Sequence, residues 1–140
     1  MNVRSFRLSD YVAVNGLLEQ VLSEVCYQET KDALAKQLSW DSDLVLIAVE
    51  EEQVVGVIIG TIDNNKGYYY RIAVHAEHRR KGIGKALIHS LKQRFEQRKV
   101  SRILITVDEH NEPILPVYES AGWFERDFAR MAERRLSIMA

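Results

Sequence analysis

The sequence has 140 residues, of which 46% are hydrophobic and 28% are charged, as is typical of one globular domain with its own core. Its single cysteine, Cys26, excludes an internal disulfide framework and a cysteine-rich zinc module. The N-terminus shows no signal-peptide core, and the longest wholly apolar run, Leu44–Val49, is far shorter than the ~20 residues of a membrane span. We therefore expect one domain, residues 1–140, located in the cytoplasm and without a membrane partner.

Positive charge is concentrated in one segment. The net charge is −1, yet residues 71–99 contain nine basic and two acidic side chains, whereas residues 1–70 contain five basic and eleven acidic ones. Nucleic-acid-binding domains usually spread basic charge over a face and have a basic isoelectric point, but the isoelectric point here is near 6.4. We therefore expect a small polyphosphate ligand and no nucleic acid, with a solvated basic helix as the simpler alternative.

The first 40 residues are predicted to form a strand and two helices. The strand lies near Val3–Phe6, and Asp10 can cap the helix that follows. Apolar residues of this helix recur with helical spacing, at Val14, Leu17, Leu18, Val21, Leu22 and Val25. Thr30 is a candidate cap of a second helix, which ends near Trp40.

The middle of the chain is predicted to form a mixed sheet. Three β-rich runs, Leu44–Val49, Val54–Ile62 and Tyr68–Val74, are separated by short polar turns and therefore form an antiparallel meander. Helical spacing returns between Gly82 and Lys99, and Arg102–Val107 reads as the next strand. A strand–helix–strand crossover of this length favours parallel pairing, so the sheet contains both kinds of pair.

The C-terminal part is predicted to form a helix and two closing strands. Pro113 and Pro116 fit a helix that begins near Pro113, because its first backbone N–H groups have no helical partner. The helix ends near Ala121, and the closing strands are Trp123–Phe124 and Met131–Ile138.

A candidate phosphate site follows the third β-rich run. There a strand ends, a basic turn follows, and Gly82 and Gly84 open a helix whose N-terminus directs unpaired N–H groups at an anion. The spacing excludes two other glycine-rich loops: a dinucleotide fingerprint needs a small residue where Leu87 stands, and a Walker A loop needs four residues before Gly-Lys-Ser/Thr. Full charges are added by Arg79, Arg80, Lys81 and Lys85.

The R-x-x-G-x-G pattern at residues 79–84 resembles the acyl-CoA pyrophosphate signature of the GNAT family of N-acetyltransferases. The resemblance extends to the strand end at residues 72–75, to Asn111 followed seven residues later by Tyr118, and to the Tyr-Glu-Ser-Ala-Gly-Trp block that ends at Trp123. The order of predicted elements also matches. The resemblance implies an α/β fold with a central mixed β-sheet flanked by about four helices, and an acetyl-CoA-dependent N-acetyltransferase.

The same resemblance implies a pose for acetyl-CoA, the expected co-substrate. Members of the family separate two neighbouring strands, here the third β-rich run and Arg102–Val107, and hold pantetheine between them like an added strand. Asn111 would hydrogen-bond the pantetheine arm, and Arg79 would anchor the turn that holds the pyrophosphate. The cofactor-binding residues that follow from the resemblance are Ile72, Ala73, Val74, Arg79, Arg80, Lys81, Gly82, Ile83, Gly84, Lys85, Asn111 and Tyr118.

Two catalytic groups also follow from the resemblance. The backbone N–H of Val74 would stabilise the developing oxyanion, and Tyr118 would protonate the leaving thiolate because a phenol is protonated at neutral pH. A tyrosine that only packs in the core is the alternative for Tyr118. We expect no metal, because His75 and His78 lack a third ligand.

The general base is not identified. Relatives use a glutamate at one of two strand positions, but these are Thr106 and Tyr68 here. A water relay to Glu29, His75 or His110 stays open, as does an amine that arrives neutral. Tyr68 and Tyr70 alternate with Ile72 and Val74, so we expect those two tyrosines to share a face with them and to be able to face the cofactor groove, although simple packing in the sheet is the more common role.

The acceptor is expected to bind at the first two helices, their loop at Cys26–Glu29, and the loop at Glu125–Arg130. Cys26 itself is expected to be a packed structural residue. The predicted reaction is acetyl transfer to a primary amine of a small molecule. The alternatives are acetylation of a protein N-terminus or lysine, and a non-catalytic acyl-CoA-binding regulatory module; a homodimer stays open as the assembly.

Overall fold

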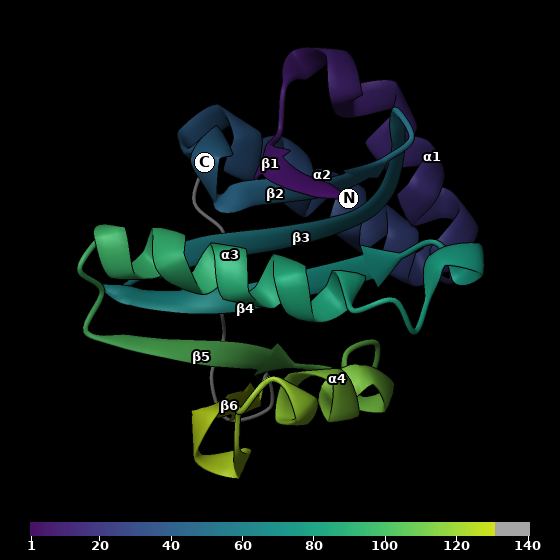
Figure 1. The fold of residues 1–140 in the computed structure, drawn as a ribbon. Coiled ribbons are helices and arrows are strands. Elements are labelled where there is room, and N and C mark those ends of the chain that lie inside the picture. Colours follow the sequence, from purple (N-terminus) through teal and green to yellow (C-terminus); the bar gives the residue numbers. More distant parts are fainter. Residues whose placement is uncertain (131–140) are drawn as a thin grey trace.

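The computed structural model describes residues 1–130, and over these residues six strands form one sheet in the order β1-β2-β3-β4-β5-β6 (Figure 1). The first three neighbouring pairs are antiparallel and the last two are parallel, which confirms the mixed sheet. No helix of this part is long and apolar enough to cross a membrane. The strands are β1 (Asn2–Ser5), β2 (Val45–Glu50), β3 (Gln53–Asp63), β4 (Lys66–Val74), β5 (Arg102–Val107) and β6 (Phe128–Arg130); the α-helices are α1 (Tyr11–Val21), α2 (Glu24–Trp40), α3 (Ile83–Gln97) and α4 (Leu115–Ser120).

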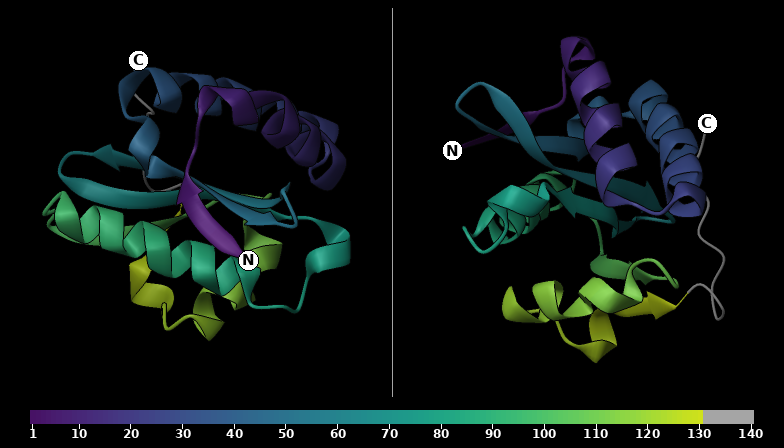
Figure 2. Two further views of the ribbon diagram at one scale, coloured as in Figure 1. Left: turned by 45° about the horizontal axis from the view of Figure 1, so that its top comes forward. Right: turned by 90° about the vertical axis from the view of Figure 1, so that its right-hand side faces the viewer.

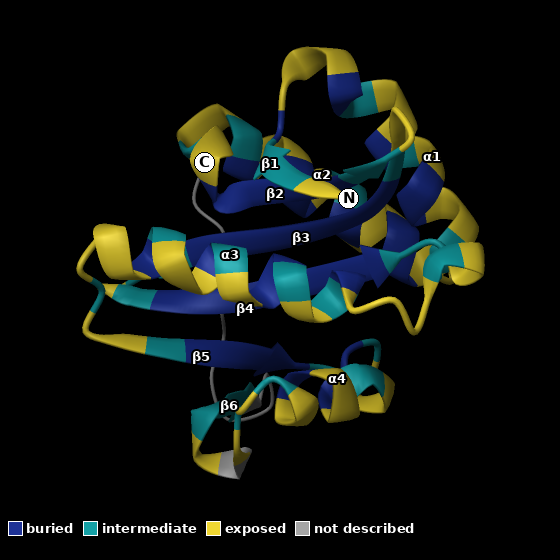
Figure 3. Cartoon of the chain, viewed as in Figure 1, coloured by how far each residue is buried: buried dark blue, intermediate teal, exposed yellow. Residues whose placement is uncertain are grey.

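Helices cover both faces of the sheet. Figure 2 shows α1 and α2 on one face and α3 on the other. Figure 3 shows that the central strands are buried and that these helices are buried on one side only, whereas β1 at the edge is partly exposed. Two apolar clusters result. The cluster under α3 includes Ile58, Leu87 and Phe95. The cluster under α1 and α2 includes Val14 and Leu34, so the helical spacing in the sequence does mark the buried faces.

The N-terminal helices divide at a different place from the one predicted. Helix α1 ends at Val21, and α2 begins two residues after Leu22, with the Oγ of Ser23 accepting a hydrogen bond from the backbone N–H of Cys26 at 3.3 Å. Val25 follows the period of α1 but belongs to α2, where it is exposed. Thr30 therefore lies inside α2 and does not cap it.

The C-terminal elements also differ in part from the prediction. Both prolines lie in first turns, one in a short 3₁₀ turn (Glu112–Ile114) and one at the start of α4, as expected. Trp123–Phe124 forms no strand, and the ring of Trp123 packs edge-on against Tyr69, with 5.2 Å between the ring centroids. The predicted strand Met131–Ile138 lies outside the described residues. The segment Glu125–Arg130, predicted as a loop, forms a 3₁₀ turn and β6.

Asp10 connects β1 to the start of α1. Its carboxylate accepts hydrogen bonds from both terminal nitrogens of Arg4, at 2.8 and 3.0 Å, and from the backbone N–H of Arg7 at 2.7 Å. The sequence suggested that Asp10 caps α1, but the Asp10 side chain makes no capping hydrogen bond to this helix. The hydrogen bond from Arg4 holds the pKa of Asp10 below its ordinary value, against the opposing effect of burial.

Asp10→Asn should lower the free energy of unfolding at pH 7 by about 1–3 kcal/mol, because it removes a charged hydrogen-bond acceptor. A carboxyl whose pKa is lowered in the folded state stabilises it above the unfolded pKa of about 4 and loses that effect as the pH falls through the folded pKa. The difference between wild type and variant, measured by urea unfolding from pH 7 downwards, should therefore shrink in acid. Asp32→Asn, at an exposed position of α2, is the control. A deficit that stays constant with pH would contradict this role.

Candidate active site

Strands β4 and β5 separate part-way along their length. Their pairing ends at Tyr69 and Ile105, although both strands continue beyond it. The side chain of Asn111 lies between the diverging strands and is fully buried. Its Nδ2 donates to the carbonyl oxygens of Tyr70 at 2.8 Å and Thr106 at 2.7 Å. The amide thus satisfies one carbonyl of each strand and keeps the strands apart.

A β-bulge in β4 changes which side chains face which layer. The register of β4 against β3 shifts by one residue, which leaves Tyr70 without a partner in β3. As a result Tyr69 packs with Ile72 and Val74 on the α3 side, whereas Tyr70 packs on the α1 and α2 side. The predicted common face of Tyr70 with Ile72 and Val74 is therefore wrong, because strict alternation does not pass through a bulge.

Arg71 is a buried cation that fixes the position of Asn111. Its side chain is 1% exposed, and Nη1 donates to Oδ1 of Asn111 at 2.7 Å and to the carboxylate of Asp108 at 3.2 Å. Its Nε donates to Oγ1 of Thr30 in α2 at 3.1 Å. Burial alone would lower the pKa of Arg71, but Tyr70 and Asp108 raise it above its ordinary value, so the guanidinium is charged.

Sequence reasoning missed Arg71, although a signal was present. A charged residue in an otherwise apolar and aromatic strand needs a buried partner of opposite charge. The partner, Asp108, directly follows β5 and also accepts hydrogen bonds from the backbone N–H groups of His110 and Asn111, at 3.0 and 2.9 Å. One carboxylate therefore shapes the turn that carries Asn111 and balances the charge of Arg71.

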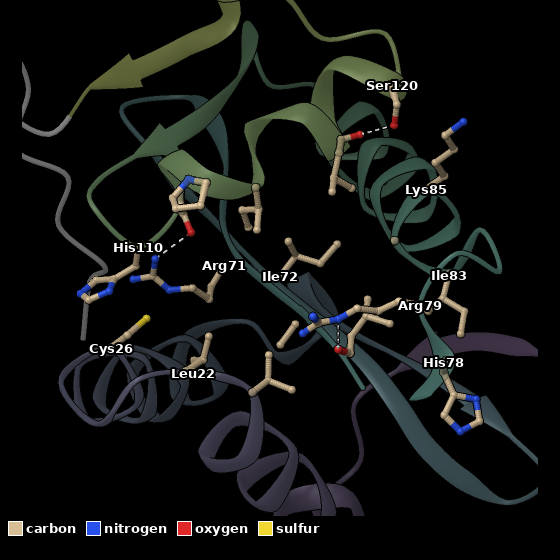
Figure 4. A pocket seen from close by; sticks show the side chains of 18 of the residues that line it. Leu22, Cys26, Arg71, Ile72, His78, Arg79, Ile83, Lys85, His110 and Ser120 are labelled. Carbon is tan, nitrogen blue, oxygen red and sulfur yellow. Dashed lines mark hydrogen bonds between the residues drawn. The ribbon is translucent and has the colours of Figure 1, made fainter. Parts of the chain in front are cut away.

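A cavity of about 860 Å³ runs along the separated part of β4 (Figure 4). One end lies at the start of α3 beside Arg79 and Lys85, and the other lies beside Cys26 and His110, as Figure 4 shows. Most of the predicted cofactor residues line it: Ile72, Ala73, Val74, Arg79, Arg80, Gly82, Ile83, Gly84, Lys85 and Asn111. Lys81 and Tyr118 do not.

The start of α3 presents backbone N–H groups to this cavity. Gly82 precedes the helix with a φ of +81°, a left-handed conformation that glycine adopts without strain, and no side chain caps the helix. The first N–H groups of a helix have no partner within it, and they lie at the positive end of its dipole. Nε of Arg79 donates to the carbonyl oxygen of Val74 at 3.3 Å and so joins the basic turn to the end of β4. This end of the cavity is suited to an anion.

Gly84 has a packing role that the sequence did not indicate. A Cβ at this position would lie 3.3 Å from Cγ1 of Val117 in α4. The glycine therefore lets α4 approach α3 closely, in addition to any contact with a ligand. A larger residue there would disturb the helix that carries Tyr118.

The backbone N–H of Val74 faces the gap between the strands. The next residue, His75, donates its N–H to the carbonyl oxygen of Val55 in β3 at 2.8 Å. Because successive N–H groups of a strand point to opposite sides, the N–H of Val74 points away from β3 and towards β5. An N–H group in this orientation is available to a bound molecule.

Lys81 directs its side chain away from the cavity. Its Nζ lies 3.5 Å from Oε2 of Glu50, and Nδ1 of His78 lies 2.9 Å from the same oxygen. The pKa of Glu50 lies below its ordinary value. The hydrogen bond with His78 is the main cause, and the charge of Lys81 acts in the same direction. Lys81 could therefore contact a ligand only through its backbone N–H. That contact stays a prediction.

Tyr118 lies behind the cavity wall, in the core. Its ring centroid is 5.6 Å from that of Tyr69, the residue is fully buried, and its hydroxyl has no hydrogen-bond partner among residues 1–130. Burial raises the pKa of Tyr118, so the phenol is protonated at neutral pH. A buried donor without an acceptor is unfavourable for folding and is a feature of functional sites. Its predicted role as proton donor stays a prediction.

The structure separates the candidates for the base. His110 lines the cavity, whereas His75 lies outside it and accepts a hydrogen bond from the backbone N–H of Glu77. Oε2 of Glu29 lies 3.8 Å from Nε2 of His110. Cys26 also lines the cavity, and burial raises the pKa of its thiol. No group of three or more metal-ligating side chains occurs in the described part of the chain.

Comparisons with known proteins agree with this geometry. A sequence model described as the acetyltransferase (GNAT) family matches residues 13–123. The fold is similar to that of the ribosomal-protein-alanine N-acetyltransferase of Brucella melitensis, with 20% identity, a TM-score of 0.69, and coverage of 87% of this chain and 83% of that one.

Two further solved structures are similar. The aminoglycoside 6'-N-acetyltransferase of Acinetobacter haemolyticus has 17% identity and a TM-score of 0.71, with 89% of this chain and 92% of that one covered. The PaiA N-acetyltransferase of Thermoplasma acidophilum, solved in complex with coenzyme A, has 17% identity and a TM-score of 0.69, with 88% and 89% covered. At these identities the likeness concerns the fold.

Asn111→Ala should lower the free energy of unfolding by about 2–4 kcal/mol, because it leaves the carbonyl groups of Tyr70 and Thr106 buried without donors. Thr106→Val is the matched control: the Thr106 hydroxyl is buried and has no partner within residues 1–130, so its removal should be neutral or stabilising. Urea unfolding of both variants measures the difference. Equal effects of the two substitutions would contradict the assigned role of Asn111.

Proposed function

The chain belongs to the acetyltransferase (GNAT) family, and from this premise we propose that it transfers the acetyl group of acetyl-CoA to a primary amine of a small molecule. The observation that carries the proposal is the gap between β4 and β5, which leads directly to the N-terminus of α3. An unpaired strand edge suits an extended chain of amides, and a helix N-terminus suits a pyrophosphate. The two lie in one cavity and in the order in which these groups occur in CoA.

The residues present fit this co-substrate. Backbone groups of Ile72 would pair with the pantetheine amides, and the N–H of Val74, which also faces the gap, would be left for the thioester oxygen. The pyrophosphate would bind the N–H groups at the start of α3, with the charges of Arg79, Arg80 and Lys85 beside it. Asn111 is committed to three protein partners, so its main contribution is to hold the gap open.

The N–H of Val74 would stabilise the negative charge that develops on the thioester oxygen during attack by the amine. Loss of one fixed donor of this kind in other enzymes lowers the rate by about 10²–10³-fold. The position is preorganised, because His75 is bonded to β3 and the carbonyl of Val74 is bonded to Arg79.

Tyr118 would give its proton to the thiolate of CoA as the carbon–sulfur bond breaks; because the hydroxyl lies behind the cavity wall, bound CoA or a water would have to contact it for this transfer. Its raised pKa keeps the phenol protonated, and its hydroxyl has no competing acceptor among the described residues. We expect the acceptor to bind at the end of the cavity beside Cys26 and His110, which we call the acceptor end. Its walls include the nearly fully buried side chains of Cys26 and Arg71, which supports a small acceptor.

The test measures thiol release from acetyl-CoA with a panel of small primary amines, and CoA affinity by calorimetry, for wild type and Tyr118→Phe. The variant should lose about 10²–10⁴-fold in kcat and keep its CoA affinity. Its stability should not fall, because the lost hydroxyl makes no hydrogen bond with any residue of the described part of the chain. Tyr69→Phe is the matched control: it removes a hydroxyl that donates to the carbonyl of Ile88 at 3.3 Å, and should lower stability by about 0.5–1.5 kcal/mol without loss of activity.

Other results would point elsewhere. CoA binding without turnover on any amine would favour a non-catalytic acyl-CoA-binding module. Turnover confined to peptides with a free N-terminus or lysine would favour a protein acetyltransferase. Full activity of Tyr118→Phe would assign protonation of the thiolate to a water or another residue.

A further inference from the structure

The proposed reaction needs a group that takes a proton from the acceptor, and the cavity limits the choice. Among its described lining residues, three carry an imidazole or a carboxylate group that can accept a proton: His78, Glu109 and His110. His78 lies at the end next to α3 and bonds to Glu50, whereas His110 lies at the opposite end beside Cys26 (Figure 4). Glu109 is 84% exposed. His110 is the base that combines burial with a place at the acceptor end.

We infer that the imidazole of His110 accepts the proton of the acceptor ammonium, directly or through one water; this inference rests on the proposed function. The side chain of His110 is 16% exposed, and its backbone N–H is bonded to Asp108 at 3.0 Å. The imidazole thus projects from the same turn that holds Asn111 between β4 and β5. Its position is fixed relative to the gap.

Two carboxylates orient the ring. Nε2 of His110 lies 3.8 Å from Glu29 and 3.5 Å from Glu109, and it is buried without a hydrogen bond among the described residues. Negative charge beside Nε2 favours a proton on that nitrogen, which leaves the lone pair on Nδ1 to receive another. Glu29 and Glu109 are therefore positioning residues.

The charge of this end of the cavity selects a cationic acceptor. The positive charge at this end belongs to Arg71, and the carboxylate of Asp108 balances it. Glu29 and Glu109 add two negative charges that this network does not neutralise. The acceptor class is therefore an aliphatic primary amine that arrives as an ammonium ion.

The protons balance as follows. His110 removes one proton from the ammonium nitrogen and later releases it to solvent. The neutral nitrogen forms a bond to the thioester carbon, and the carbon–sulfur bond breaks. Tyr118 protonates the sulfur, and the second proton lost by the nitrogen restores the Tyr118 hydroxyl through water. The products are the N-acetyl amine, CoA with a free thiol, and one proton.

The test compares His110→Gln with wild type on a series of primary amines whose ammonium pKa values span the assay pH. For strongly basic amines the variant should lose about 10²–10³-fold in kcat/KM, because the amine stays protonated. The deficit should shrink towards unity for weakly basic amines, which arrive neutral. Calorimetry should show unchanged CoA affinity. His89→Gln, an exposed histidine of α3, is the control.

Glu29→Gln provides a second variant at an exposed position. It should lose about 2–5-fold with strongly basic amines and nothing with weakly basic ones, as expected for a residue that acts through His110. A readout without turnover is the imidazole NMR signal of His110, which should shift when a strongly basic amine of the series is added to the CoA complex. The signal of His89 should not shift.

Three results would overturn the inference: retention of more than a third of wild-type kcat/KM by His110→Gln with basic amines, an equal deficit for all amines, or no shift of the His110 signal. If His110→Gln does not fold, the amine dependence of Glu29→Gln decides. Failure of the proposed function looks different, because wild type would then release no thiol with any amine. Loss of activity in Tyr118→Phe with full activity in His110→Gln would refute only the role of His110.

Discussion

The buried side chain of Asn111 is the contact on which the candidate site depends. Parallel strands with matching edges would continue to pair, and here β4 and β5 both extend beyond their last pair. The Asn111 amide instead donates to one carbonyl of each strand, so that separation leaves neither carbonyl unsatisfied. Without this amide the strands could remain apart only with buried, unpaired carbonyl groups.

A charged network holds that amide in place. Arg71 donates to Asn111 and to Asp108, and Asp108 accepts from the backbone of the turn that carries Asn111. A buried ion pair is weak support for stability by itself, but loss of one partner leaves the other charge buried and unpaired. The network therefore couples β4, α2 and the turn before α4. The same turn positions His110 and leads into the helix that carries Tyr118.

Much of the fold could be predicted from the sequence because it depends on local pattern. The meander, the crossover helix and the basic turn before Gly82 follow from apolar periods and glycine spacing. The break between α1 and α2 could not be placed, because Val25 continues the period of α1 while Ser23 caps the next helix. The bulge at Tyr70 is a single added residue in β4, and alternation of side chains gives no sign of it.

The end of the cavity next to α3 could be predicted from the sequence, because it is built from neighbouring residues that a motif describes. At the other end the sequence named Glu29 and His110 only among several candidates, and it missed Arg71 and Asp108. That end brings together Glu29, Arg71 and the turn that contains Asp108 and His110, three segments that lie far apart in sequence and meet only in the fold. Gly84 shows the limit within the motif itself, since a Cβ at this position would meet a side chain of α4.

The most direct test of the central claim is a crystal structure of the protein with CoA. The account predicts that pantetheine lies between β4 and β5, bonded to the backbone of Ile72, with the pyrophosphate on the N–H groups at the start of α3. Asn111 should keep its bonds to Tyr70 and Thr106. CoA bound elsewhere, or β4 and β5 paired through to their ends with the gap closed, would contradict the account.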